Sequence, residues 1–171
     1  SAAAMLLSRL TDNDIGSCTG SGTGMFGDDL KTKTVILEKV LKKHKDAKEP
    51  LDALAAFGGL EIATLAGAVI QAASERRVIV VDGFIASSAV LVASKIEPAV
   101  LDYCIFSHRS DEQGHSLMLN EMSAKPLLDL NLRLGEGSGA ALAWPLLVSA
   151  CTILRDMASF DAAGVSRDEK K

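Results

Sequence analysis

Hydrophobic residues recur along most of the chain with the period of an α-helix, and only short stretches depart from that pattern. The spacing predicts helices over residues 1–10, 28–44, 50–57, 60–74, 84–95 and 112–122, and a last long helix that ends near residue 160. The 60–74 segment carries almost no charge after Glu61, so we expect that helix to be buried on most sides.

Three short segments predict strands instead of helices. Residues 78–82, VIVVD, form a β-branched run without alternation, which is typical of an interior parallel strand covered on both faces. Residues 101–106, LDYCIF, are a second candidate, and residues 15–18 are a third short strand or extended piece. Helices that alternate with such strands predict an α/β fold with a parallel sheet flanked by helices. Ligands in these sheets bind beyond the carboxyl ends of the strands, so we expect residues 82–83, 107–110 and 16–24 to collect at one edge.

Composition and charge exclude several classes of protein. A chain of 171 residues that is 48% hydrophobic can bury a core as one domain and is not disordered. Its 18 basic and 22 acidic residues are mixed along the sequence, so no basic stripe indicates binding to nucleic acid. Cys18, Cys104 and Cys151 form no CxxC pair and indicate buried, reduced thiols in a cytoplasmic protein. The spacing of His108 and His115 matches no metal motif, so no metal site is expected.

The longest uncharged run, residues 137–154, is near the lower length limit for a membrane span. Pro145 and several small or polar residues interrupt it, so the sequence predicts a buried core helix and no membrane. The first residues show neither a signal peptide nor an initiator Met, which suggests a chain that begins inside a longer protein or has been processed. We expect residues 1–164 to form the α/β domain and residues 165–171 a charged tail.

Two motifs beside the expected strands allow a functional and a structural interpretation each. Gly20 to Gly24, GSGTG, precedes a helix with Lys33 and is able to cradle a phosphate, although a flexible surface loop is at least as compatible. It is neither a Walker A loop nor G-x-G-x-x-G. Asp82 either bonds a ligand or a neighbouring loop, or acts as a helix cap or turn residue.

The SHRSDEQGH segment places more polar residues at a strand end. Arg109 could bind a carboxylate or phosphate, but a structural salt bridge is the favoured interpretation. His108 as a general base would need a nucleophile that the spacing does not identify.

The most unusual motif is LGEGSG, in which Gly135 and Gly137 flank Glu136. Ser138 could cap the following helix, and Glu136 could simply be an acid that stabilises its first turn. Helix stabilisation needs no flanking glycines, however, so the motif favours a tight turn or a close approach by a ligand.

Several segments together resemble one enzyme family. They are FGGLEIATLAGAVIQAA, VIVVDGFIASSA, SHRSDEQGH, PLLDLNLRLGEGSGAALAWPLL, and GSGTG followed by Lys33. In motif order the chain resembles the C-terminal half of nicotinate-nucleotide–dimethylbenzimidazole phosphoribosyltransferases. The resemblance implies a Rossmann-like three-layer fold that is incomplete relative to the full-length enzyme. It also implies phosphoribosyl transfer from nicotinate mononucleotide to 5,6-dimethylbenzimidazole in cobalamin lower-ligand synthesis, without a cofactor.

The resemblance also assigns roles to residues. Glu136 resembles the catalytic base of the family, and the expected phosphate- and nucleotide-binding residues are Gly22, Thr23, Gly24 and Lys33. Asp82, Ser110 and Gly135 are expected to line the active site. The implied partners are nicotinate mononucleotide, a benzimidazole-type base and, in the full-length form, a second copy as a homodimer in the cytoplasm.

Two other functions stay open on the sequence. The chain could be a truncated, non-catalytic domain that binds a phosphorylated nucleotide or docks with a partner chain. A weaker alternative is an α/β domain for a nicotinamide cofactor, which the lack of G-x-G-x-x-G after VIVVD argues against.

Overall fold

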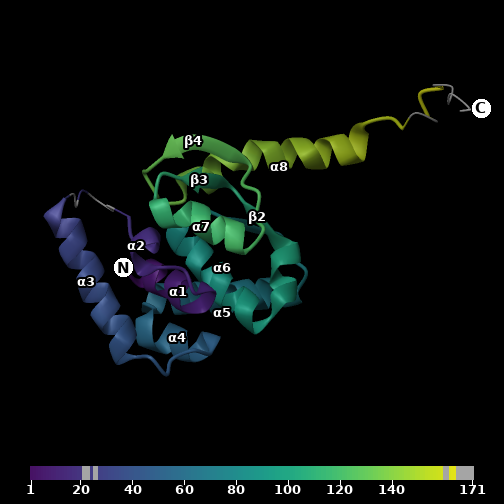
Figure 1. Cartoon of the computed structure of the whole chain (residues 1–171). Helices are drawn as coiled ribbons and strands as arrows, with labels where there is room; N and C mark the ends of the chain where they lie inside the picture. The colour runs from purple at the N-terminus through teal and green to yellow at the C-terminus, as the bar shows by residue number, and fades with distance from the viewer. Residues whose placement is uncertain (21–23, 25–26, 160–161, 165–171) are drawn as a thin grey trace, which may run out of the picture.

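One helix, α6 (Phe84–Ile96), lies at the centre of the packing (Figure 1). This computed structural model describes residues 1–20, 24, 27–159 and 162–164. All eight residues from Ser87 to Ser94 are buried, and the helix contacts α1 (Ala2–Thr11), α4 (Pro50–Phe57), α5 (Leu60–Ser74) and α7 (Gln113–Glu121). Small side chains let these neighbours approach closely. The hydroxyls of Ser88 and Ser94 donate back to carbonyls in their own helix, at 2.6 and 2.8 Å, so they can be buried with partners.

The strands are short and parallel, in agreement with the predicted α/β class. Strand β1 (Ile79–Val81) pairs with β2 (Cys104–Phe106), and β3 (His108–Ser110) pairs with β4 (Leu128–Leu132). Ser107 joins β2 to β3: its N–H donates to Val81 in β1 at 2.9 Å, and its carbonyl accepts from Leu128 in β4 at 3.0 Å. The segment 104–110 is therefore bonded to β1 along its first half and to β4 along its second half.

The second predicted strand is shorter than expected, and two further strands escaped prediction. A 3-10 helix, η1 (Pro98–Tyr103), occupies the start of the predicted 101–106 strand, because Pro98 fixes its first turn and Glu97 caps the N–H of Ala99 at 3.2 Å. Strands β3 and β4 lie in segments whose polar residues suggested loops.

The prediction of a strand at residues 15–18 is wrong. These residues form a short helix, α2 (Ile15–Cys18), and the Asp14 carboxylate accepts the N–H of Ser17 at 3.1 Å. This side-chain cap gives a partner to a backbone N–H that has none inside the helix, so it favours a helix over a strand here.

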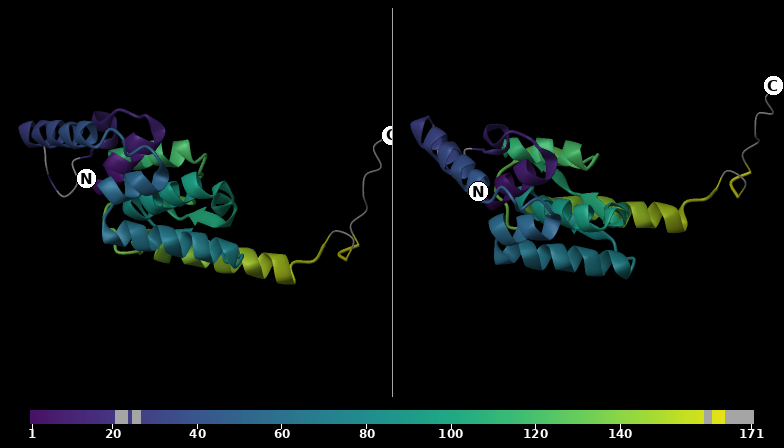
Figure 2. Two further views of the ribbon diagram at one scale, coloured as in Figure 1. Left: turned by 90° about the horizontal axis from the view of Figure 1, so that it is seen from below. Right: turned by 60° about the horizontal axis from the view of Figure 1, so that its bottom comes forward.

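The predicted helices are present, but the expected burial of two of them is wrong. Helix α3 (Asp28–Lys43) agrees with its predicted range. Only Ile62, Ala66, Val69 and Ala73 are buried in α5, and Leu60 at its start is 87% exposed. Helix α5 packs on α6 with one face and leaves the other face in solvent (Figure 2).

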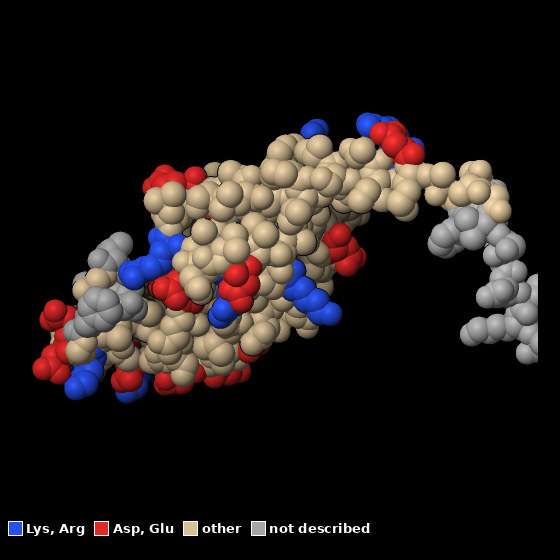
Figure 3. Space-filling model, turned by 90° about the horizontal axis from the view of Figure 1, so that it is seen from above, with Lys and Arg blue, Asp and Glu red and all other residues tan. Residues whose placement is uncertain are grey.

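The last helix, α8 (Ser138–Asp156), departs furthest from prediction. Only Gly139 and Ala143 are buried, whereas Trp144 is 59% and Leu154 is 89% exposed. Its main contacts are with β3 and β4 near its first turns, so the rest projects from the body and shows an almost uncharged surface (Figures 1 and 3). Among the described helices, α8 alone is long and apolar enough to cross a membrane by length and composition. A single helix of this kind is weak evidence for a span.

The cysteines are free thiols in three different environments. Cys18 is buried and Cys104 is half-buried, and burial raises the pKa of each thiol to about 11. Cys151 is exposed on α8, so the expectation of three buried thiols is wrong for this residue.

Candidate functional site

A cleft of about 820 Å³ opens where the carboxyl ends of β1 and β3 meet the start of α6 and the loop before α8. Its volume is in the range that suits a small-molecule ligand. Five residues that the sequence nominated lie along it: Lys33, Asp82, Ser110, Gly135 and Glu136. The prediction that residues 82–83, 107–110 and 16–24 collect at one edge of the parallel strands is confirmed for six of them, which line this cleft: Thr19, Gly20, Asp82, Gly83, His108 and Ser110.

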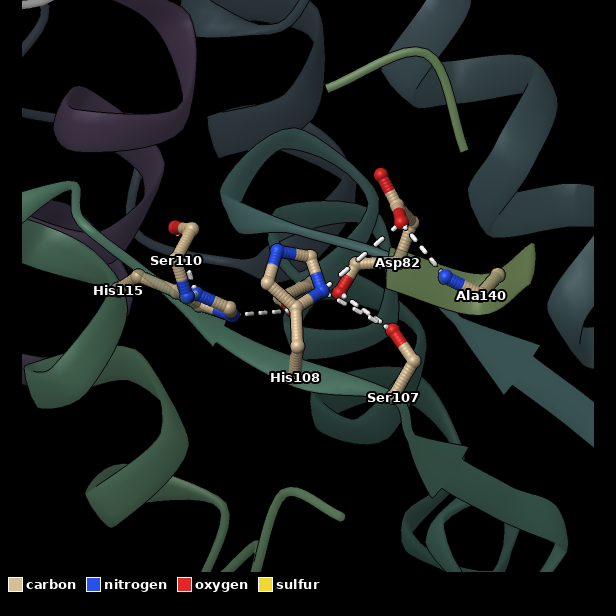
Figure 4. A network of polar contacts seen from close by, with 7 residues as sticks. Asp82, Ser107, His108, Ser110, His115 and Ala140 are labelled. Carbon is tan, nitrogen blue, oxygen red and sulfur yellow. Dashed lines mark hydrogen bonds and ion pairs between the residues drawn. The ribbon is translucent and has the colours of Figure 1, made fainter. Parts of the chain in front are cut away.

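A network of polar contacts underlies this edge (Figure 4). At its centre are two buried imidazoles, His108 at the start of β3 and His115 in α7, whose ring centroids are 6.2 Å apart. The network links the ends of two strands, the helices α6 and α7, and the first turn of α8. It therefore holds in place the elements that form this side of the cleft.

The His115 ring has a defined hydrogen-bonding pattern. Its Nδ1 accepts from the backbone N–H of Ser110 at 3.0 Å, so in the neutral ring the proton lies on Nε2. Nε2 lies 3.0 Å from the Ser87 hydroxyl and donates to it. Burial, followed by the nearby charge of His108, lowers the pKa of His115 to about 4, so this imidazole is neutral at physiological pH.

The His108 ring lies between Asp82 and Ser107. Its Nδ1 is 3.1 Å from the Ser107 hydroxyl and 3.9 Å from Oδ1 of Asp82, which is too long for a hydrogen bond to the carboxylate. The Ser107 hydroxyl in turn lies 3.3 Å from the backbone carbonyl of Asp82. Ser107 is fully buried, so its hydroxyl is a structural partner of His108 and not an accessible nucleophile.

Asp82 binds the first turn of α8. Its Oδ1 accepts the backbone N–H of Ala140 at 3.0 Å, 58 positions away in the chain. Asp82 is not the N-cap of the helix that follows it, because Gly83 is the N-cap of α6 and no side chain caps that helix. The prediction that Ser138 caps α8 is wrong. Gly137 is the N-cap and Ser138 is the first helical residue, whose hydroxyl is buried without a partner within the described chain.

The loop before α8 has an unusual backbone. Gly135, Glu136 and Gly137 all have positive φ angles, of 74°, 58° and 77°. Glycine adopts this left-handed region freely, whereas a glutamate there costs about 1 kcal/mol. The Glu136 side chain is exposed, and no hydrogen bond or ion pair engages its carboxylate within the described chain. The flanking glycines thus have a conformational role, as the motif suggested.

Lys33 of α3 also lines the cleft. It is half-buried, and its Nζ donates to the carbonyl of Gly20 at 3.2 Å, directly before the glycine-rich segment. Gly22 and Thr23 lie outside the described residues, so their predicted phosphate contacts stay predictions. Gly24 is exposed with a φ of 126° and is not part of the described cleft lining.

Arg109 takes the structural role that its sequence context favoured. Its guanidinium binds both carboxylate oxygens of Asp129 in β4, at 2.9 and 2.8 Å, and both side chains are about half exposed. Within the described chain, no group of three or more His, Cys, Asp or Glu side chains is placed to hold a metal ion.

Three charged residues of the cleft were not nominated by the sequence. They are Glu61 at the start of α5, Glu112 before α7 and Arg133 after β4. Glu112 directly follows the SHRSD strand end, and this position is the signal that would have identified it. Glu61 and Arg133 carry no comparable signal, because neither follows a predicted strand.

Comparison with known sequences identifies relatives across nearly the whole chain. A phosphoribosyltransferase family model matches residues 1–165. The chain is 64% identical over 169 residues to a nicotinate-nucleotide–dimethylbenzimidazole phosphoribosyltransferase of Variovorax paradoxus, covering 99% of the chain and 48% of that relative. A protein of the same name from Cupriavidus necator is 55% identical over 97% of the chain, again covering 48% of the relative.

The fold also resembles that of a solved structure over nearly the whole chain. The crystal structure of CobT from Thermus thermophilus superimposes with a TM-score of 0.90 at 38% identity, covering 97% of this chain and 50% of that one. The chain thus spans about half the length of the relatives it matches.

Proposed function

This chain belongs to the phosphoribosyltransferase family, and we propose that it supplies the catalytic base for phosphoribosyl transfer from nicotinate mononucleotide to 5,6-dimethylbenzimidazole. The products are α-ribazole 5'-phosphate and nicotinate, and the reaction belongs to cobalamin lower-ligand synthesis. The observation that carries the proposal is the cleft, whose lining includes the ammonium of Lys33 and the carboxylate of Glu136, which no described residue engages.

The chemistry needs one proton acceptor. A neutral benzimidazole attacks the C1 carbon of the ribose through the lone pair of one ring nitrogen, and the bond from C1 to nicotinate breaks. The electron pair of that bond goes to the nicotinate nitrogen, which leaves as a neutral pyridine. Positive charge develops on the attacking base, so its other N–H becomes acidic and Glu136 can accept that proton. The negative carboxylate also stabilises the developing cation.

The reaction also requires that the nucleotide be held in position against the attacking base. Lys33 carries a positive charge to the cleft and suits a phosphate, and the adjacent glycine-rich segment could add backbone N–H donors. Holding the ribose and the base in contact lowers the barrier further by removing the entropy cost of their encounter. No electrons are transferred, so the reaction requires no redox cofactor.

The family names of the relatives support this function, because each is named for nicotinate nucleotide and dimethylbenzimidazole. For the full-length form we propose a homodimer in the cytoplasm that binds neither nucleic acid nor membrane. Light scattering of the full-length form tests the homodimer, and cell fractionation tests its location.

The alternative is a non-catalytic domain that binds a phosphorylated nucleotide or docks with a partner chain. The observation that favours it is the exposed apolar surface of α8, on which Trp144 is 59% and Leu154 is 89% exposed. Calorimetry with nicotinate mononucleotide, followed by a turnover assay with 5,6-dimethylbenzimidazole, separates the two functions. Binding with release of nicotinate supports catalysis, whereas binding without turnover supports the alternative.

A further inference from the structure

We propose that Asp82 is a positioning residue for Glu136, which acts by fixing the first turn of α8 through the N–H of Ala140. The proposal rests on the catalytic role of Glu136 stated above and deepens it. Asp82 lies at the end of β1, and Glu136 lies in the loop directly before α8. The link between them is the short helical turn at residues 138–140.

The first turn of α8 needs a cap that its own sequence does not provide. The first N–H groups of an α-helix have no partners inside the helix, and an N-cap side chain commonly accepts from the third helical residue. Here Gly137 is the N-cap and has no side chain, and the hydroxyl of Ser138 bonds to nothing within the described chain. Ala140 is the third helical residue, and the carboxylate of Asp82 accepts its N–H at 3.0 Å.

The charge of Asp82 also suits this location. The N-terminus of a helix carries partial positive charge, so an anion beside it is stabilised. The Asp82 side chain is 20% exposed, which limits screening by water. Asp82, at the end of strand β1, thus supplies the cap that the sequence of α8 lacks.

A second contact holds the same turn against the strands. Gly139 lies on the imidazole of His108, and a Cβ atom added at Gly139 would overlap with that ring. His108 is 3% exposed and is held by Ser107, so the surface that receives Gly139 is well defined. The turn is therefore fixed from two sides, by a hydrogen bond to Ala140 and by packing against Gly139.

Glu136 depends on this anchor because its own side chain has none. Its carboxylate makes no bond within the described chain, so the backbone sets its position. That backbone is tied to α8 by two bonds, from Ser138 N–H to the Gly135 carbonyl at 2.9 Å and from Ala141 N–H to the Gly137 carbonyl at 2.9 Å. A loosened first turn would let the carboxylate move relative to the cleft.

Steady-state kinetics of the full-length form test the proposal with Asp82→Ala and Asp82→Asn. We expect Asp82→Ala to lower kcat by about 100-fold, the scale of a catalytic group displaced by about 1 Å, with little change in either KM. Asp82→Asn keeps an oxygen that can accept from Ala140, so it should recover most of the lost kcat. Asp46→Ala, in an exposed turn, is the matched control and should behave as the parent protein.

Amide hydrogen exchange gives a readout that does not require turnover. Asp82→Ala should speed exchange at residues 138–141 and leave exchange in α6 unchanged, whereas Asp82→Asn should do neither. Gly139→Ala should also speed exchange in this turn, because its methyl group overlaps with the His108 ring, and His108→Ala should relieve that effect in the double variant.

The outcomes separate the two proposals. An inactive parent protein would overturn the proposed function, and the exchange data would then decide alone whether Asp82 fixes the turn. An active parent whose Asp82→Ala variant has a raised KM and an unchanged kcat would show that Asp82 binds substrate, and would overturn the positioning role. An Asp82→Asn variant as slow as Asp82→Ala, or unchanged exchange in both, would overturn it as well.

Discussion

The backbone N–H of Ser110 donates to Nδ1 of His115 at 3.0 Å, and this contact determines which nitrogen of the ring carries the proton. Nε2 then donates to Ser87 in the central helix, so a neutral His115 ties β3 and α7 to α6. A second proton on Nδ1 would remove the acceptor for Ser110 and place a charge in the core.

We expect this arrangement to make the protein sensitive to acid. The pKa of His115 is about 4 in the folded protein and has an ordinary value of 6.5, so below 6.5 the unfolded state binds this proton first. The stabilisation is complete above pH 6.5, and about 3 kcal/mol of unfolding free energy is lost as the pH falls toward 4. Urea unfolding over this pH range measures the effect.

The matched variants for this measurement are His115→Gln and His44→Gln. His115→Gln removes the titrating ring and should flatten the pH dependence, even though it lowers the stability at neutral pH. His44 is exposed, so His44→Gln should leave the pH profile unchanged. Equal profiles for the parent and His115→Gln would refute the assignment.

Glu136→Gln should nearly abolish turnover in the full-length form. The amide has the same size but cannot accept the proton from the base, so kcat should fall by about 10²- to 10⁴-fold. Binding of nicotinate mononucleotide, measured by calorimetry, should survive. Glu49→Gln, at an exposed position, serves as the control, and near-normal turnover of Glu136→Gln would remove Glu136 from the mechanism.

Lys33→Ala should weaken binding of the nucleotide. Loss of one charge-assisted contact to phosphate should raise the KM for nicotinate mononucleotide by about tenfold or more, with a smaller effect on kcat. Lys31→Ala tests the neighbouring lysine of α3, whose exposed ion pair with Asp28 lies away from the described cleft. An unchanged KM for Lys33→Ala argues against a phosphate contact.

Arg109→Ala should have little effect on either catalysis or stability. Both side chains are about half exposed, and exposed ion pairs typically contribute about 0 to 1 kcal/mol. Thermal unfolding of Arg109→Ala, Asp129→Ala and the double variant isolates the pair energy. A large rise in a substrate KM would instead show that Arg109 reaches the ligand.

The sequence predicted helices well because their apolar spacing is local information. It also predicted that Asp82 and Ser110 approach one another, because both follow parallel strands and the ends of such strands share an edge. It failed at residues 15–18, where a four-residue apolar run is compatible with helix or strand and the Asp14 cap decides. Strand β4 escaped prediction because Leu128 to Leu132 pairs with a polar segment far from it in sequence.

The burial of α8 could not be predicted, because an uncharged helix has the same pattern whether or not neighbours cover it. The cap on the N–H of Ala140 could not be predicted from the sequence either. Ser138 satisfies the local rule for a cap, and only the fold shows that a residue 58 positions away takes that role. The described backbone explains the glycines around Glu136, whereas the phosphate-binding role of residues 22–24 stays a prediction.

We expect the hydrogen bond between Asp82 and Ala140 to form late in folding. Contacts between residues distant in sequence form late, because the intervening chain must first lose entropy. The first turn of α8 has no local cap, so it can reach its final position only after β1 and the His108 surface exist. A molecule whose core is still unfinished would therefore not yet hold Glu136 in place.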